Sequence, residues 1–170
     1  MSRNTLPGDQ AQLNRVEIHD APKNSDVSNA DPSGLLPEFL NGLLFTDSRQ
    51  LVANVQTKFV LAQVNRFFFP VTVNDKQFEN SYVCSPYTGM ISYSLEELNN
   101  INSLPVRTII RLLAACASPL LKAANINRVA CVNNSMLSTN LYPNWKGEGL
   151  DELTGKLTAC FPRHAVMFRS

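Results

Sequence analysis

Residues able to do chemistry are few in this chain, and they form no known catalytic motif. The sequence contains two histidines, His19 and His164, and none of the glycine-rich, zinc-peptidase or nucleophile-elbow signatures. Because His19 falls in a polar segment expected to lack order, His164 is the one imidazole expected in the folded part. An imidazole can transfer protons near neutral pH. At the start of a strand, however, it more often serves as a structural hydrogen-bonding residue.

The four cysteines give no sign of a metal site. Cys84, Cys116, Cys131 and Cys160 are widely spaced and contain no CxxC pair, which is the spacing that zinc and redox sites use. The first residues, MSRNTLPGDQ, lack the apolar core of a secretory signal. We therefore expect four reduced thiols in a cytoplasmic protein, and no metal.

A densely polar segment follows the strand predicted at RVACV and is the best candidate for a ligand-binding loop. Ligands of open α/β sheets bind beyond the carboxyl ends of the strands. Tyr142, Tyr87 and His164 are weaker candidates for a catalytic role at such a site. The alternative is that the polar residues only form a turn and cap the next helix. The predicted ligand-binding residues are Asn133, Asn134, Ser138, Thr139 and Asn140.

The composition predicts one globular domain behind a disordered arm. The chain has 170 residues, 44% of them hydrophobic and 17% charged, with a formal net charge of +1, which suits a single core. Scattered cations exclude the clustered basic surface that nucleic acid requires. The polar, aperiodic residues 1–34 predict disorder, with a short strand at LNRVEIHD as the alternative. Residues 35–170 are then the α/β domain.

The order of predicted elements indicates a mixed sheet flanked by helices. Short helices are expected near residues 35–45 and 48–56, a strand-rich run at 58–75, and two strands, SYVCS and MISYS, around a turn. A capping box at Ser94 and Glu97 predicts a short helix, and Pro105 opens a longer one that Pro119 ends or kinks. The strand RVACVNN, a helix near 149–161 and the strand HAVMFR follow, so the sheet should be parallel in its C-terminal part.

The longest apolar stretch, IIRLLAACASPLLKAANI, is predicted to be a core helix. Arg111, Ser118, Pro119 and Lys122 interrupt it. These residues make a membrane span costly. We therefore expect no membrane span in this chain.

Several segments resemble a known superfamily. NSYVCSPYTGMISYSLEEL, RVACVNNSMLSTNLYP and FPRHAVMFRS, taken in order, resemble a poorly characterised bacterial group of GNAT-like acyltransferases over residues 50–170. The resemblance implies a mixed sheet whose splayed strand pair holds an acyl-coenzyme A, with the pyrophosphate at a helix N-terminus. The superfamily's Q/R-x-x-G-x-G/A loop is absent, and the sequence stops directly after a strand. This predicts an N-terminal part of a GNAT-like unit, incomplete at its C-terminus, or else a self-sufficient variant without the cofactor.

Two classes of function stay open. In the first, the resemblance implies acyl transfer from an acyl-coenzyme A thioester to a substrate amine, which needs chiefly positioning and a polarising donor. Tyr142 and the asparagine-rich loop would supply donors, and His164 a base. In the second, the chain is a non-catalytic protein-interaction or oligomerisation domain. Three consecutive aromatic residues, Phe67, Phe68 and Phe69, must point to both faces of a strand. The more common explanation is a strand buried on both faces, and the alternative is an apolar patch that a partner or a second copy covers.

Overall fold

The computed structural model of the chain describes residues 15–20, 42–44, 46–136 and 144–169. Its centre is a five-stranded mixed sheet in which the strands lie in the order of the sequence. Neighbouring strands are antiparallel from β1 to β4, and β4 and β5 are parallel. The strands are β1 (Val16–Asp20), β2 (Lys58–Val64), β3 (Phe67–Asn74), β4 (Val129–Val132) and β5 (Ala165–Phe168). The predicted α/β class and the parallel C-terminal pairing are confirmed.

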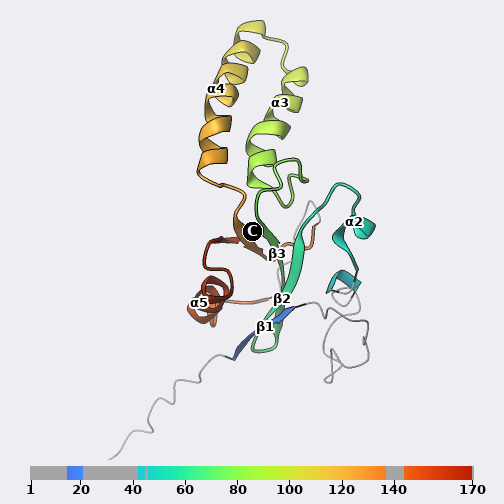
Figure 1. The fold of residues 1–170 in the computed structure, drawn as a ribbon, viewed down its shortest axis with the longest axis vertical. Helices are drawn as coiled ribbons and strands as arrows, with labels where there is room; N and C mark the ends of the chain where they lie inside the picture. The colour runs from blue at the N-terminus through green and yellow to red at the C-terminus, as the bar shows by residue number, and fades with distance from the viewer. Residues whose placement is uncertain (1–14, 21–41, 45, 137–143, 170) are drawn as a thin grey trace, which may run out of the picture.

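The helices that follow β3 occupy two places around this sheet (Figure 1). α5 lies against the sheet, whereas α3 and α4 form a hairpin that projects away from it. The helices are α2 (Ser48–Leu51), a π-helical turn η2 (Thr88–Ser92), α3 (Tyr93–Glu97), a 3-10 turn η3 (Leu98–Asn100), α4 (Leu104–Ala123) and α5 (Leu150–Cys160).

The strand-rich run 58–75 forms a tight hairpin of β2 and β3. The two strands are joined at Asn65 and Arg66, and Asn65 adopts a φ of 53°, which asparagine tolerates better than most residues. β3 lies between β2 and β4 but contains Pro70, which has no N–H to donate. The proline fits because β4 pairs with β3 only from Val71 onward, and the Pro70 carbonyl accepts the N–H of Asn134 at 3.0 Å.

One face of the sheet is apolar and packs against α5. Alternate residues of β2, β3 and β4 point to this face, where Leu153 and Leu157 of α5 complete the core and are fully buried. Burial of a leucine stabilises the fold by about 1.5–3 kcal/mol, so these two side chains dominate the docking of α5. The sheet residues of this core are Val16, Val60, Ala62, Val64, Phe69, Val71, Val73, Ala130 and Val132.

The opposite face combines a smaller apolar cluster, built on Phe59 and Leu61, with buried amides. We call Asn74, Asn80, Asn127 and Asn134 the asparagine set; each is at most 4% exposed. Their side chains bind backbone groups of the irregular segment 77–87 or join it to the chain before β2. Buried backbone groups outside ladders need such partners. The set therefore holds this segment against the sheet.

Asn127, just before β4, shows how the asparagine set works. Its Oδ1 accepts the N–H of Tyr87 at 2.9 Å and the hydroxyl of Ser85 at 3.1 Å. Its Nδ2 donates to the carbonyl of Gln77 at 3.0 Å. One side chain thus fixes both ends of the segment 77–87.

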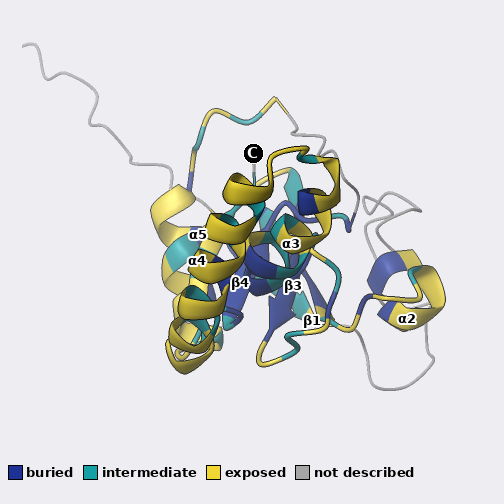
Figure 2. Ribbon diagram, turned by 90° about the horizontal axis from the view of Figure 1, so that it is seen from above, coloured by how far each residue is buried: buried dark blue, intermediate teal, exposed yellow. Residues whose placement is uncertain are grey.

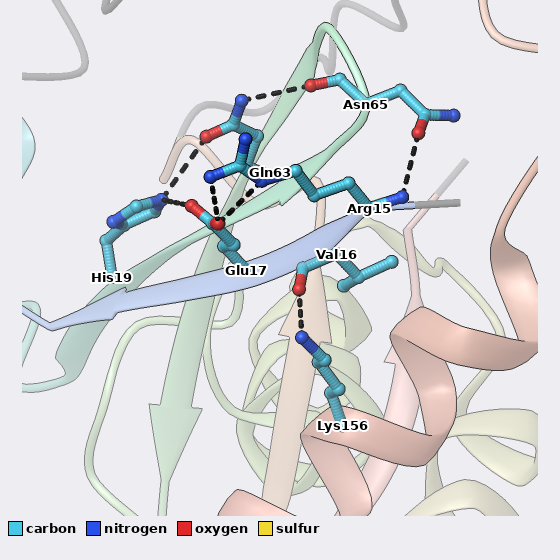
Figure 3. Close-up of polar contacts among 7 residues, drawn as sticks. All are labelled: Arg15, Val16, Glu17, His19, Gln63, Asn65 and Lys156. Carbon is cyan, nitrogen blue, oxygen red and sulfur yellow. Dashed lines mark hydrogen bonds and ion pairs between the residues drawn. The ribbon is translucent and has the colours of Figure 1, made fainter. Parts of the chain in front are cut away.

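β1 shows order within the segment expected to form a disordered arm. Val16–Asp20 pair antiparallel with β2, as in the alternative interpretation of LNRVEIHD, whereas residues 1–14 and 21–34 lie outside the described residues. Side chains reinforce the pairing (Figure 3): Asn65 accepts the Arg15 N–H at 3.0 Å, and Lys156 of α5 donates to the Val16 carbonyl. The expectation that His19 lacks order was wrong, because it lies in β1, 3.3 Å from Gln63.

The two strands predicted at SYVCS and MISYS are absent from the described structure, where the segment turns and then becomes helical. Ser85 caps the helical part: its Oγ accepts the Thr88 N–H at 3.0 Å, and Pro86 follows. A serine cap before a proline at the first helical position starts a helix. The capping box at Ser94 was also a wrong prediction, since Ser94 lies inside α3.

The prediction that the long apolar helix is a core helix is wrong. α4 runs without a break from Leu104 to Ala123, with Pro119 inside it, and only Ala114 is buried. Figure 2 shows α4 mostly in the colour of exposed residues, with some intermediate residues, while the strands behind it are largely buried. The periodicity of the sequence correctly predicted a helix, but it could not predict whether other elements cover that helix.

Replacement of Asn127 by alanine tests the asparagine set. The change leaves the Gln77 carbonyl and the Tyr87 N–H without their side-chain partner, so we expect unfolding free energy to fall by about 2–3 kcal/mol. Urea denaturation measures the loss. Asn100→Ala, at an exposed asparagine, is the control and should stay within about 0.5 kcal/mol of the wild type. Equal stability of the two variants would contradict the role of the set.

Candidate functional site

The structure separates the residues that the sequence grouped into one site. Asn133 and Asn134 follow the carboxyl end of β4, and His164 precedes the amino end of β5. Because β4 and β5 are parallel, these residues lie at opposite edges of the sheet. Ser138, Thr139, Asn140 and Tyr142 lie outside the described residues.

Asn134 has the contacts of a structural residue. Its Nδ2 donates to Thr72 Oγ1 at 2.8 Å and to the Val83 carbonyl at 2.7 Å. Its Oδ1 accepts the Met136 N–H and a guanidinium N–H of Arg169, both at 3.1 Å. Since the side chain is fully buried and these four contacts engage both ends of its amide, it has little left for a ligand. Asn133 beside it is buried too, with a left-handed φ of 60°.

Tyr87 lies at the base of the α3–α4 hairpin. Its hydroxyl lies 2.7 Å from Ser118 Oγ of α4, its ring packs edge-on against Phe78, and the Lys122 ammonium lies 5.0 Å from the ring centroid. The side chain is 7% exposed. These contacts attach α4 to the segment that the asparagine set holds, so Tyr87 supports the hairpin.

His164 contributes to a cleft of about 610 Å³ that the sequence did not reveal. β3 runs antiparallel to β2 and β4, so its carboxyl end meets the amino ends of β2, β4 and β5 at this edge. Polar side chains from several elements line the cleft. They include Arg49, Thr57, Lys58, Asp75, Gln77 and His164.

An ion cluster lies beside this cleft. Oδ1 of Asp75 is 3.4 Å from Arg128 Nε and 3.7 Å from His164 Nε2. The His164 side chain is 10% exposed and that of Asp75 is 53% exposed. An imidazole beside a carboxylate suits proton transfer. The two hydroxyls of the cleft already donate to backbone carbonyls, Ser48 to Val55 and Thr57 to Val73 or Lys58, so the arrangement is better suited to binding than to nucleophilic catalysis.

Sequence reasoning missed Asp75 and Arg128 for a simple reason. Asn74-Asp75 had the composition of a turn, and Arg128 stands alone before a strand. Only the antiparallel order of β3 and β4 brings them together. The available signal was a charged residue directly after β3 and another directly before β4. This signal predicts a contact only once the strand directions are known.

The four cysteines fall into two classes, buried and exposed. All four cysteines are free; Cys84 and Cys131 are buried, and Cys116 and Cys160 are exposed. Burial raises the pKa of Cys84 from 9.0 to about 12 and that of Cys131 to about 11. Neutral thiols are poor nucleophiles. In the part of the chain that the structure describes, no group of three or more His, Cys, Asp or Glu side chains is placed to hold a metal ion.

The outer surface of α4 is a second candidate site, of a different kind. Val106, Ile109, Leu113 and Leu120 are 43%, 57%, 63% and 70% exposed, and Cys116 is exposed among them. Together these five residues are called the α4 seam. Large contiguous apolar surface on a folded protein marks an interaction site.

α4 is also long and apolar enough to cross a membrane by length and composition, the one such helix among the described residues. A single helix of this kind is weak evidence for a span. Arg107, Arg111 and Lys122 lie within it, and cations are costly at the centre of a bilayer.

Comparison of the chain with protein-family models, with curated proteins and with solved structures finds no match. Function is therefore argued from the geometry of the two candidate sites.

Alkylation should separate the two pairs of cysteines. At about pH 8 and at concentrations where the protein is monomeric, iodoacetamide should modify the exposed Cys116 and Cys160 in the folded protein. It should reach Cys84 and Cys131 only after unfolding, because burial raises the pKa values of these two thiols. Mass spectrometry counts the adducts. The raised pKa values also mean that the stability contributed by these thiols is present below pH 9.0 and is lost as the pH rises toward 11 to 12. Four adducts on folded protein would contradict the burial.

Proposed function

We propose that this chain is a protein-interaction domain that self-associates through the α4 seam. The carrying observation is that a 20-residue helix exposes most of its large apolar side chains, while the sheet supports it only at its base. A helix face of this kind is normally covered. This function is the second of the two classes expected from the sequence, a non-catalytic interaction domain. The proposed partner is a second copy of the same chain.

The spacing of the seam suits another helix. Val106, Ile109, Leu113, Cys116 and Leu120 follow one another at intervals of three, four, three and four residues. This is the a/d repeat of helix pairs that pack knobs into holes. At about 100° per residue the five side chains cover about 80° of the helix circumference, which is a narrow seam suited to one partner helix.

The charge pattern favours a second copy of the same helix. The seam contains no charged residue. The three cations of α4 lie on other sides of the helix, with Arg111 about 180° from the middle of the seam. Two α4 helices can therefore pair without bringing like charges into contact, and the buried leucines supply the free energy.

Replacement of Leu113 by glutamine tests self-association. Because Leu113 contributes from both copies, the change should cost about 3 kcal/mol or more and raise the dimer dissociation constant at least about 100-fold. Sedimentation equilibrium measures the dissociation constant of each protein. Monomer stability should change by no more than about 0.5 kcal/mol, since the residue is exposed.

The matched control is Ala115→Gln, which introduces the same side chain about 140° around α4 from the middle of the seam. It should associate like the wild type. A wild type that stays monomeric, or that binds lipid vesicles through Leu113 instead, would overturn the proposal.

Acyl-coenzyme A binding is a second candidate function, supported by one observation. β4, α5 and β5 form a parallel unit within an otherwise antiparallel sheet, as expected of a GNAT-type mixed sheet. In that reading the pyrophosphate binds at the N-terminus of α5. Asp151 and Glu152 occupy its first turn, with Glu148 just before it, and these carboxylates oppose an anion. The negative charge of these carboxylates disfavours a pyrophosphate site at α5, so self-association is favoured over acyl-coenzyme A binding.

A thermal-shift titration with acetyl-coenzyme A tests the second candidate. A ligand that binds only the native state raises the melting temperature. Removal of the opposing charge in Asp151→Asn/Glu152→Gln should strengthen any binding at α5. If neither protein shows a shift at any concentration, acyl transfer is excluded as the function of this domain. Self-association through α4 is unaffected by either result.

A further inference from the structure

Beside the cleft at the carboxyl end of β3 lie three buried nitrogens of two side chains, and they point to a ligand. Arg128 Nε and both ring nitrogens of His164 are buried and make no hydrogen bond in the part of the chain that the structure describes. Buried donors without a partner are uncommon in folded proteins and call for an explanation. Here they lie next to a cleft of about 610 Å³ that His164 itself lines.

The two donors converge on a single atom. Arg128 Nε and His164 Nε2 lie 3.4 and 3.7 Å from the same oxygen, Oδ1 of Asp75. These distances are longer than charge-assisted hydrogen bonds, which are about 2.7–2.9 Å. The Asp75 carboxylate therefore lies at the position of an acceptor without bonding closely to either donor.

Asp75 is free to leave this position. Its side chain is 53% exposed, and it follows the last residue of β3. Its backbone N–H is held by Gln77 Oε1 at 2.9 Å, so the side chain can rotate outward while the backbone stays in place. Rotation would open Arg128 and His164 to the cleft.

We propose that Arg128 and His164 form a binding site for a small carboxylate, and that Asp75 occupies this site as an internal stand-in for the ligand. The carboxylate of the ligand would displace Asp75 and bond to both donors. Its body would lie in the cleft, where Thr57 and Gln77 offer polar contacts and Arg49 a cation for a second carboxylate. A small polar dicarboxylate matches this arrangement. The site lies at the sheet edge and is separate from the α4 seam.

Succinate is the probe, and Asp75→Asn is the decisive variant. Removal of the internal carboxylate should tighten succinate binding about tenfold, as expected if the open site is populated about a tenth of the time. Asp151→Asn makes the same charge change on α5, outside the cleft, and should bind like the wild type. Arg128→Gln should lose binding. Sodium chloride at matched ionic strength controls for general salt effects.

The two histidines allow the site to be observed directly by NMR. Succinate should shift the ring signals of His164 and leave those of His19, which lies in β1, unchanged. This readout uses the wild type and Asp75→Asn, so it does not depend on the folding of Arg128→Gln. Unchanged His164 signals in both proteins would overturn the proposal, as would equal succinate affinity of Asp75→Asn and Asp151→Asn.

Discussion

The amides of the asparagine set fix the irregular segment 77–87, which follows β3, and most features of the molecule depend on that attachment. This segment has no ladder of its own, so its buried backbone groups rely on side chains for partners. Asn127 and Asn134 reach it from either end of β4, and Asn74 reaches it from β3 by donating to the Cys84 carbonyl. The apolar face under α5 supplies much of the hydrophobic stabilisation, but it does not determine where this segment lies.

The position of the segment in turn places both candidate sites. Ser85 and Tyr87 lie at its end and start the helical hairpin, and Tyr87 then binds Ser118 of α4. The hairpin is thereby directed away from the sheet and leaves the α4 seam exposed (Figure 1). At the other end, Asp75 lies between β3 and the segment, and its carboxylate lies near Arg128 and His164. One set of buried hydrogen bonds thus underlies an apolar surface and a polar cleft.

The sequence predicted the elements whose signals are local. The apolar run of β4, the helix α5 and the strand β5 all follow from periodicity and turn residues. The short helix predicted from residue 48 is present as α2, which Asp47 caps by accepting the Arg49 N–H. Prediction from the sequence failed between β3 and α4, because SYVCS and MISYS have the composition of strands. There, tertiary hydrogen bonds to Asn127 and Asn134 outweigh strand propensity. The helical wheel of α4 could not show exposure, because an apolar helix covered by a core and one left uncovered have the same pattern.

The loop predicted as the ligand site and the charged cleft lie at opposite edges of the sheet. The loop after β4 was preferred because ligands of parallel sheets bind at carboxyl ends. In this mixed sheet, the carboxyl end of β3 lies at the opposite edge, and the charged residues meet there. His164 was recognised from its type alone, whereas its neighbours Asp75 and Arg128 required the strand directions.

Pairing of α4 with α4 in a second copy is the central claim, and Cys116 offers the most direct measurement. Cys116 lies in the seam and is exposed, whereas Cys84 and Cys131 are buried. A second copy of α4 would cover Cys116, so its alkylation rate in a Cys160→Ser background reports the pairing. The account predicts that iodoacetamide modifies Cys116 more slowly as the protein concentration rises through the dimer dissociation constant, and that Leu113→Gln abolishes this protection. Equal alkylation rates at concentrations where the protein is monomeric and where it is dimeric would contradict it.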